Sequence, residues 1–116
     1  MREVIFYRTG MGRSPIDEFL NTLSSNQARK VAWVLNLVEE LDIVPSQYFQ
    51  KMPNTEDLWE VRVRTGSNIF RFLGFFDGTK LVVLSHAFQK KTRKTPRQAI
   101  QLAEERKRNY FRRKTE

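Results

Sequence analysis

The chain has 116 residues, of which 40% are hydrophobic and 12% aromatic, with one histidine and no cysteine. This composition predicts a single folded domain over residues 1–116, and it excludes disorder, a disulfide scaffold and a thiolate metal site. The net charge of +8 comes entirely from residues 86–116, since residues 1–85 carry equal numbers of acidic and basic side chains. We therefore expect the C-terminal part to meet a polyanion, with nucleic acid as the first candidate.

The first elements are a strand and a helix. Val4 to Tyr7 form a short apolar run that ends before two glycines, which predicts a strand. Ser14 and Pro15 are typical of a helix start, because serine caps the first turn and proline suits the first helical position. Apolar residues then follow at helical spacing: Ile16, Phe19, Leu20 and Leu23.

A second, longer helix is predicted to begin at Ser24, with Gln27 completing a capping box. Helical spacing is kept by Ala28, Val31, Leu35, Val38 and Leu41, and Trp33, Val34 and Leu37 widen the apolar face. We expect this helix to cover a sheet. The region from Val44 to Asp57 contains two prolines and has no clean period, so it is interpreted as a loop.

Three strand-like runs follow. Leu58 to Arg64 alternates strictly between apolar and charged residues, and Ile69 to Phe76 is rich in aromatics. Asp77-Gly78 is a hairpin signal, and Leu81 to Phe88 is the return strand. Links this short predict an antiparallel meander.

A last, basic helix is predicted with Thr95 as its cap and Pro96 at its first helical position, and with Ile100, Ala103 and Tyr110 as its apolar stripe. The predicted fold class is α+β. It comprises a small, mostly antiparallel sheet, two N-terminal helices on one face and a C-terminal basic helix, in the order β-α-α-β-β-β-α.

Two other classes of protein are not expected. The N-terminal residues lack a signal-peptide apolar stretch and no 18-residue apolar run exists, so we predict a cytoplasmic protein with no membrane span. His86 has no carboxylate partners at helical spacing, so neither a metal nor another cofactor is predicted.

The predicted sheet carries three arginines. Arg62 and Arg64 project on the face opposite Trp59, Val61 and Val63, which predicts one buried face and one positive face; a solvated exterior explains each of them equally well. Arg71 is the one charge in an otherwise apolar strand. It must either pair with an acid such as Glu60 or hold a phosphate in a bidentate fork.

Further candidates follow the last strand. His86 is interpreted first as a packed residue and only second as a functional one, and Phe88 is expected in the core rather than under a stacked base. Four cations, Lys90, Lys91, Arg93 and Lys94, precede a helix N-terminus, where the helix dipole disfavours them unless an anion is bound. The cations near the end of the helix are partly explained by the same dipole.

Three segments together resemble the phage-derived HigB-like branch of the RelE/ParE toxin superfamily. They are Leu58-Trp59-Glu60-Val61-Arg62, Phe70-Arg71-Phe72 and the run from His86 to Pro96, whose Phe-x-Lys-Lys-Thr-x-Lys-Thr-Pro pattern is the most specific. The resemblance extends from Met1 to about Phe111.

The resemblance implies a toxin of a type II toxin–antitoxin pair, a metal-independent endoribonuclease that cleaves mRNA on the ribosome. Its implied partners are mRNA, the ribosome, a helix-turn-helix antitoxin and, through the antitoxin complex, operator DNA. Arg71, Lys90 and Lys91 match catalytic positions. Substrate-binding charge is implied at Arg62, Arg64, His86, Arg93 and Lys94. Ribonuclease toxins of this kind often end in a reactive Tyr or His, whereas this chain continues into a basic helix, so the general base stays unassigned.

Two other functions stay open at the level of sequence. A toxin of the same fold could poison DNA gyrase without catalysis of its own. Alternatively, the basic C-terminal part alone is compatible with a non-toxic module that binds nucleic acid.

Overall fold

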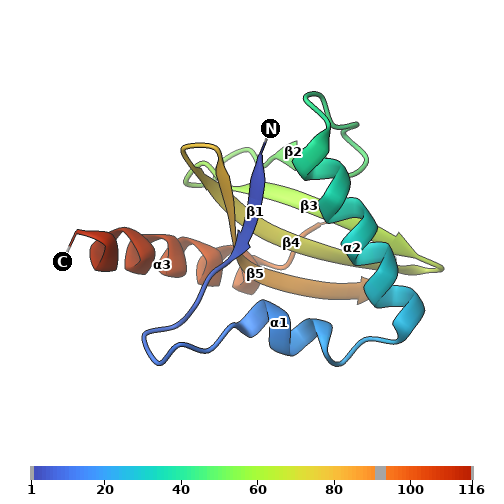
Figure 1. The fold of residues 1–116 in the computed structure, drawn as a ribbon, viewed down its shortest axis with the longest axis horizontal. Helices are drawn as coiled ribbons and strands as arrows, with labels where there is room; N and C mark the ends of the chain where they lie inside the picture. Colours follow the sequence, from blue (N-terminus) through green and yellow to red (C-terminus); the bar gives the residue numbers. More distant parts are fainter. Residues whose placement is uncertain (1, 91–93, 116) are drawn as a thin grey trace.

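A computed structural model describes residues 2–90 and 94–115, with the backbone alone for Gln89 and Lys90. Figure 1 shows a curved sheet with helices on both of its faces. The elements are β1 (Glu3–Phe6), α1 (Pro15–Leu20), α2 (Ser25–Glu40), β2 (Phe49–Lys51), β3 (Trp59–Thr65), β4 (Asn68–Asp77), β5 (Lys80–Lys90) and α3 (Arg97–Lys114). None of the helices in this described part of the chain has the length and apolarity needed to cross a membrane.

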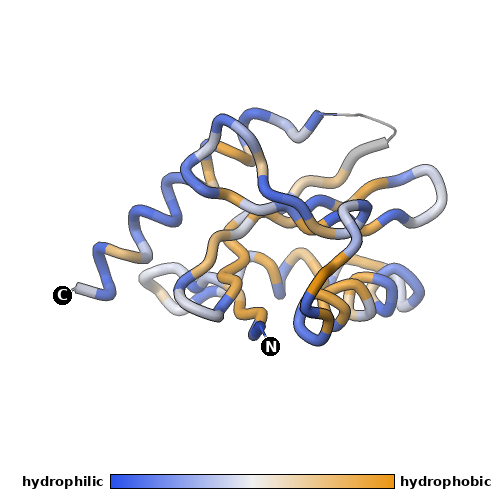
Figure 2. The backbone as a smooth tube through the Cα atoms, turned by 90° about the horizontal axis from the view of Figure 1, so that it is seen from above, coloured by the Kyte–Doolittle hydropathy of each residue, from blue (hydrophilic) through white to orange (hydrophobic). Residues whose placement is uncertain are grey.

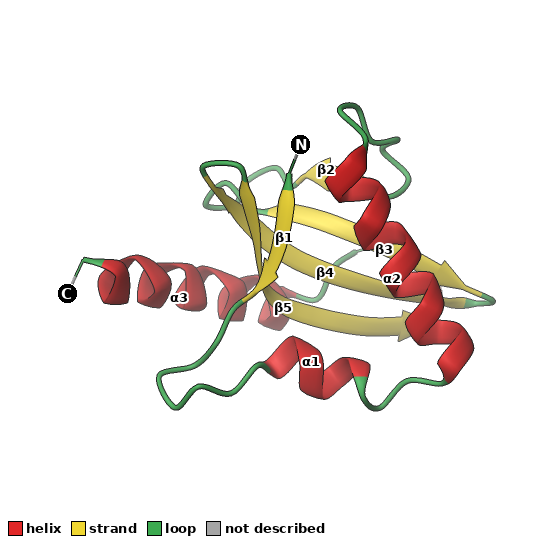
Figure 3. Ribbon diagram, in the orientation of Figure 1, coloured by secondary structure: helices red, strands yellow, loops and turns green. Residues whose placement is uncertain are grey.

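The strands form one five-stranded sheet in the order β1-β5-β4-β3-β2. β2 to β5 pair antiparallel with their neighbours, and β1 joins the edge of β5 in parallel. Figure 3 shows α1 and α2 lying across one face of this sheet, with α3 on the other side. The predicted α+β class and the antiparallel meander are therefore confirmed.

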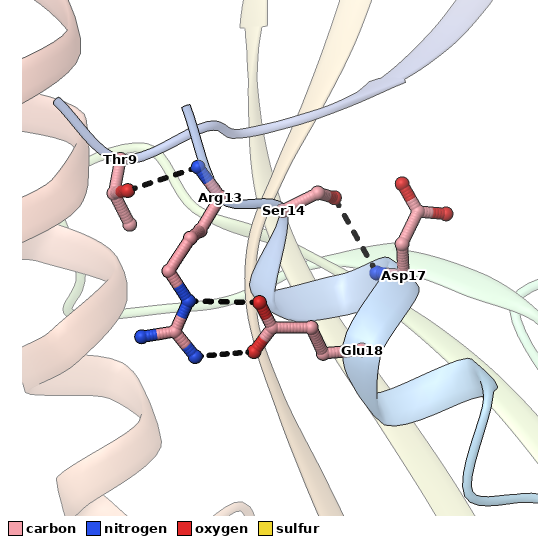
Figure 4. Close-up of polar contacts among 5 residues, drawn as sticks. All are labelled: Thr9, Arg13, Ser14, Asp17 and Glu18. Atoms are coloured by element: carbon pink, nitrogen blue, oxygen red, sulfur yellow. Dashed lines mark hydrogen bonds and ion pairs between the residues drawn. The ribbon is translucent and has the colours of Figure 1, made fainter. Parts of the chain in front are cut away.

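Both N-terminal helices begin where their caps predict. Figure 4 shows the start of α1, where the Asp17 backbone amide donates to Ser14 Oγ and Arg13 pairs with Glu18 at 2.6 Å. Ser24 caps α2 in a complete capping box with Gln27. These local hydrogen bonds satisfy backbone donors that have no partner within the helix. Leu23, by contrast, lies beyond the end of α1.

The sheet is packed on both faces. One core lies under α1 and α2 and contains Ile16, Val31, Val34, Val38, Phe49, Val61, Val63, Phe70, Phe72, Leu81 and Val83. A second core lies under α3 and contains Tyr7, Leu58, Leu73, Phe75, Val82, Leu84, Ala87, Ala99 and Ala103. The prediction of one wholly positive face is thus wrong in part, because α3 covers the stretch of that face made by β4 and β5. Trp33, expected on the covered face of α2, is 48% exposed.

The C-terminal helix keeps the predicted apolar stripe while the rest of its surface is charged. In Figure 2 most of α3 has the hydrophilic colour. Ala99 and Ala103 of this helix are buried against the sheet, and Ile100 and Tyr110 of the same helix pack beside them. Small side chains at these two positions let the helix backbone approach the sheet closely.

Two predictions about element boundaries are wrong. The region from Val44 to Asp57 contains the edge strand β2, which has too few residues to show a sequence period. Phe49 in this strand stacks on Trp59, with ring centroids 4.9 Å apart. Thr95 does not cap α3, because Pro96 occupies the cap position and has no side-chain hydrogen bond to offer. The Thr95 hydroxyl is used elsewhere, as described below.

Gly74 lies at a bulge that shifts the pairing of β4 with β5. Leu73 pairs with Ser85 and Gly74 with Val83, so Leu84 is the extra residue. A Cβ added at Gly74 would lie 2.6 Å from the Val82 carbonyl oxygen. Because that contact is with backbone, the strand must move to relieve it.

We therefore expect Gly74→Ala to lower the free energy of unfolding by about 1–3 kcal/mol, the usual effect of overpacking. Gly10→Ala is the matched control, since nothing lies within 4 Å of the added Cβ there. Urea unfolding monitored by circular dichroism measures both variants. Equal midpoints for the two variants would contradict the close approach at Gly74.

Candidate functional site

A buried acid, Glu60 in β3, organises the part of the second sheet face that α3 leaves uncovered. Glu60 is 2% exposed and accepts hydrogen bonds from three side chains. Arg62 Nε donates to its Oε1 at 2.6 Å, and a terminal nitrogen of Arg71 donates to the same oxygen at 3.1 Å. The hydroxyl of Thr95 donates to Oε2. Three donors offset the cost of burying the carboxylate.

The pairing of strands explains why these groups meet. Arg62 in β3 lies directly opposite Arg71 in β4, and Glu60 is two residues before Arg62 on the same face of the same strand. Glu60 thus lies between a guanidinium on its own strand and one on the neighbouring strand. Of the two partners predicted for Arg71, an acid or a phosphate, the structure shows the acid.

Arg71 itself does not reach the surface in this arrangement. Its side chain is 2% exposed, whereas that of Arg62 is 35% exposed. A phosphate can therefore approach Arg62 directly, whereas the buried side chain of Arg71 is not open to direct contact. The catalytic role implied for Arg71 stays a prediction.

A pocket of about 530 Å³ opens beside Arg62, at the edge of β3 that β2 leaves unpaired. Three cations line it: Lys30 from α2, with Arg62 and Arg64 from β3. The other lining residues that the structure describes are neutral, namely Gln47, Tyr48, Gly66 and Ile69. A concave surface with three cations and no described carboxylate in its lining is suited to a polyanion such as a phosphodiester.

The sequence predicted two of these cations and missed the rest of the pocket. Arg62 and Arg64 share the pocket, as their alternation in the strand indicated. Lys30, Gln47 and Tyr48 reach it only because α2 and the segment before β2 pack beside β3. No spacing in the sequence relates a lysine in a helix to an arginine in a strand more than thirty residues later.

His86 and Phe88 lie on the opposite face of the sheet, with the aromatic core. His86 is half-buried and stacks on Phe19 with ring centroids 4.0 Å apart, in agreement with its interpretation as a packed residue. Phe88 stacks on Phe70 at 4.9 Å but is 49% exposed, so the expectation of full core packing is wrong. The structure therefore separates these two residues from Arg62 and Arg64.

Burial, and secondly the positive charge of Arg106, lower the pKa of His86 below its usual 6.5. The imidazole is therefore neutral at pH 7. The folded state disfavours the charged imidazole. We therefore expect the contribution of His86 to the free energy of unfolding to be fully present above about pH 6.5. It is lost as the pH falls through the lowered pKa of the folded state.

This prediction can be checked directly, since His86 is the one histidine of the sequence and gives a single imidazole signal in a proton NMR titration. We expect a midpoint below 6.5. Arg106→Gln is expected to raise the midpoint only partway, because burial is the larger cause. A wild-type midpoint at or above 6.5 would contradict the packing of the ring on Phe19.

Residues at the two ends of the basic segment after β5 are bonded to the sheet. The backbone of Lys90 pairs with Asn68 at the end of β4, and the Thr95 hydroxyl binds Glu60. Lys91 and Arg93 lie outside the described residues, as does the Lys90 side chain, and Lys94 is exposed. Lys94 is next in sequence to Thr95, whose hydroxyl donates to Glu60.

Cations of α3 are in large part engaged within the domain. Arg108 pairs with Glu56 at 2.8 Å and Lys114 with Asp77 at 2.8 Å. Arg106 donates to the Leu84 carbonyl at 2.6 Å. Tyr110 donates to the Asp77 carboxylate, which raises the tyrosine pKa to about 12. Much of the charge on this helix therefore has a structural explanation, as the dipole argument predicted in part.

No group of three or more His, Cys, Asp or Glu side chains is placed to hold a metal ion within residues 2–90 and 94–115. The chemistry of the face around Glu60 is that of arginine and lysine, which bind phosphate and stabilise negative charge on its oxygens.

Comparison with models of protein families gives a match over most of the chain. The model of a family described as "Phage derived protein Gp49-like (DUF891)" matches residues 18–108. This span contains the pocket, Glu60 with its partners and the basic segment. No curated protein matches the chain.

Proposed function

Because the chain belongs to the Gp49-like family of phage-derived proteins, part of the RelE/ParE-like toxin superfamily, we propose that it is the toxin of a type II toxin–antitoxin pair. In this proposal it is a HigB-like endoribonuclease that cleaves mRNA on the ribosome and so arrests translation. It acts in the cytoplasm, without metal or cofactor.

One observation carries this proposal. The buried carboxylate of Glu60 accepts a hydrogen bond from Arg62, in the sheet, and another from Thr95, at the end of the basic segment. Lys30, Arg62 and Arg64, which are far apart in the sequence, line one pocket beside this carboxylate, and this supports the binding of a phosphodiester there. Pre-positioned charge of this kind stabilises a transition state without reorganisation during the reaction.

The chemistry follows from these residue types. The 2′-hydroxyl of the RNA attacks the adjacent phosphorus, the bond to the 5′-oxygen breaks, and negative charge builds on the phosphate oxygens. In this mechanism Arg62, Lys90 and Lys91 stabilise that charge. A lysine crowded by cations has a lowered pKa and can take the proton of the 2′-hydroxyl.

Other residues have supporting roles in the proposal. Arg64, Arg93 and Lys94 bind phosphates that flank the cleaved bond. Arg71 keeps the catalytic role that the resemblance implies, and a positioning role through Glu60, which binds the guanidinium of Arg62, is the alternative. His86 lies on the other face of the sheet, so its support for the substrate would be indirect, through the packing of β5.

The partners in the proposal are the ribosome with its mRNA, and a helix-turn-helix antitoxin that binds operator DNA together with the toxin. The family supports an antitoxin partner. The exposed part of α3 offers a basic surface for either ribosomal RNA or the antitoxin.

The decisive test is to induce the protein without an antitoxin and to map mRNA 5′ ends across the transcriptome. We expect growth arrest with new ends inside translated regions. Arrest with intact transcripts and a DNA damage response would instead indicate a gyrase poison. Normal growth with intact transcripts would indicate a non-toxic nucleic-acid-binding protein.

A further inference from the structure

Two aromatic rings and a lysine lie together beside the cationic pocket at the edge of β3. Trp33 of α2 meets Tyr48 edge-on, with ring centroids 5.8 Å apart. The ammonium of Lys30 lies 4.8 Å from the centroid of the Trp33 ring. Lys30 and Tyr48 are themselves lining residues of the pocket, so Trp33 contacts the pocket wall through both of them.

Trp33 is exposed in a way that packing does not explain. It is 48% exposed, although α2 buries Val31, Val34 and Val38 against the sheet. Its ring lies outside the core, in an edge-on contact with Tyr48 and with the Lys30 ammonium over one ring face. An indole fixed in this manner offers a flat apolar face to solvent, next to charge that suits phosphate.

Flat aromatic faces beside cations are the combination that single-stranded nucleic acid requires. A base stacks on the ring, and the phosphates on either side of it meet lysine or arginine. The pocket volume of about 530 Å³ lies within the range of roughly 300–1,000 Å³ that is usual for small-ligand sites. An acidic peptide would use the three cations but would leave the indole without a stacking partner.

We propose that Trp33, Tyr48 and Lys30 form a stacking subsite for one nucleotide of single-stranded RNA. Lys30, Arg62 and Arg64, the three cations of the pocket lining, bind the phosphates on either side of that nucleotide. The inference rests on the proposed function in one respect, since the RNA is taken to continue from this subsite toward the cleaved phosphate near Glu60. Binding at the subsite does not itself require cleavage.

Tryptophan fluorescence reports on the subsite, because Trp33 is one of two tryptophans and the other, Trp59, is partly buried and packs against Phe49 and Phe76. The probe is a 2′-O-methyl RNA hexamer, which has no free 2′-hydroxyl and so cannot be cleaved. An abasic hexamer with the same phosphates is the matched probe. We expect the hexamer with bases to quench Trp33 emission and to bind about tenfold more tightly than the abasic hexamer.

Variants separate stacking from charge. Trp33→Ala is expected to weaken hexamer binding about tenfold, as for the loss of one stacked base, while Trp33→Phe retains most of the affinity. Lys30→Ala is expected to lower the slope of log affinity against log salt by about 0.7, the change for one phosphate contact on a single strand. Arg29→Ala removes a cation from the same helix outside the pocket lining and is expected to leave that slope unchanged.

Equal affinity of Trp33→Ala and the wild type for the hexamer would overturn the subsite, as would equal binding of the two hexamers. The proposed function fails separately. If mRNA stays intact after induction while the hexamer still quenches Trp33, the protein binds RNA at this subsite without cleaving it.

Discussion

Replacing Arg71 with methionine is expected to lower the free energy of unfolding by about 3–5 kcal/mol, the usual cost of removing one partner of a buried ion pair. Arg71 and Glu60 are each 2% exposed, and their side chains are 3.1 Å apart. Methionine fills similar space but leaves the buried carboxylate with less compensation. Chemical unfolding at neutral pH, with circular dichroism as the probe, measures the loss.

A second substitution tells a structural role of Arg71 from a catalytic one. Glu60→Gln removes the buried negative charge, so the double variant Glu60→Gln/Arg71→Met is expected to be more stable than Arg71→Met alone. If the folded double variant still arrests growth, the role of Arg71 is structural. If it is folded and inactive while Glu60→Gln alone is active, Arg71 acts directly on the substrate. Wild-type stability in Arg71→Met would contradict the buried pair.

The largest loss of activity is expected from the double variant Lys90→Ala/Lys91→Ala, with mRNA cleavage falling at least about a hundredfold. The reason is the anchoring of this segment. The backbone of Lys90 pairs with Asn68, and the Thr95 hydroxyl donates to Glu60; the proposal puts the lysine side chains beside Arg62. Cations that are already in position before the reaction lower its barrier most where negative charge develops in the transition state.

The matched control is Arg108→Ala/Arg112→Ala, which removes the same charge from exposed positions of α3. Arg108 there loses only its surface pair with Glu56, and such pairs contribute little to stability. We expect this control to retain most of the cleavage measured by primer extension on a ribosome-bound transcript. A larger loss in the control than in the lysine variant would move the active surface to α3.

The two double variants also test how the functions of the net charge of +8 are divided between the basic segment and α3. The sequence places all of it after residue 85, yet the structure uses that charge in different ways. Arg106, Arg108 and Lys114 of α3 bind a carbonyl or carboxylates of the domain itself. Lys94, next in sequence to Thr95, is exposed.

Most of the fold was predictable because its signals are local. Caps at Ser14 and Ser24 are hydrogen bonds across three residues, and the alternation in Leu58 to Arg64 is a property of one strand. The missed strand β2 illustrates the limit. Three residues carry no period, and Phe49 is held there by stacking on Trp59, a partner ten residues away.

The sequence by itself determined the α+β class, the order of the main elements, and two of the pocket cations, Arg62 and Arg64. Only the tertiary structure decided which other groups join them. Glu60 accepts hydrogen bonds from Arg71 and Thr95, because a buried carboxylate is stable only where several donors surround it. Lys30, Tyr48 and Trp33 meet the sheet edge because α2 packs across β3. Such contacts depend on how whole elements pack, and no spacing along the chain encodes them.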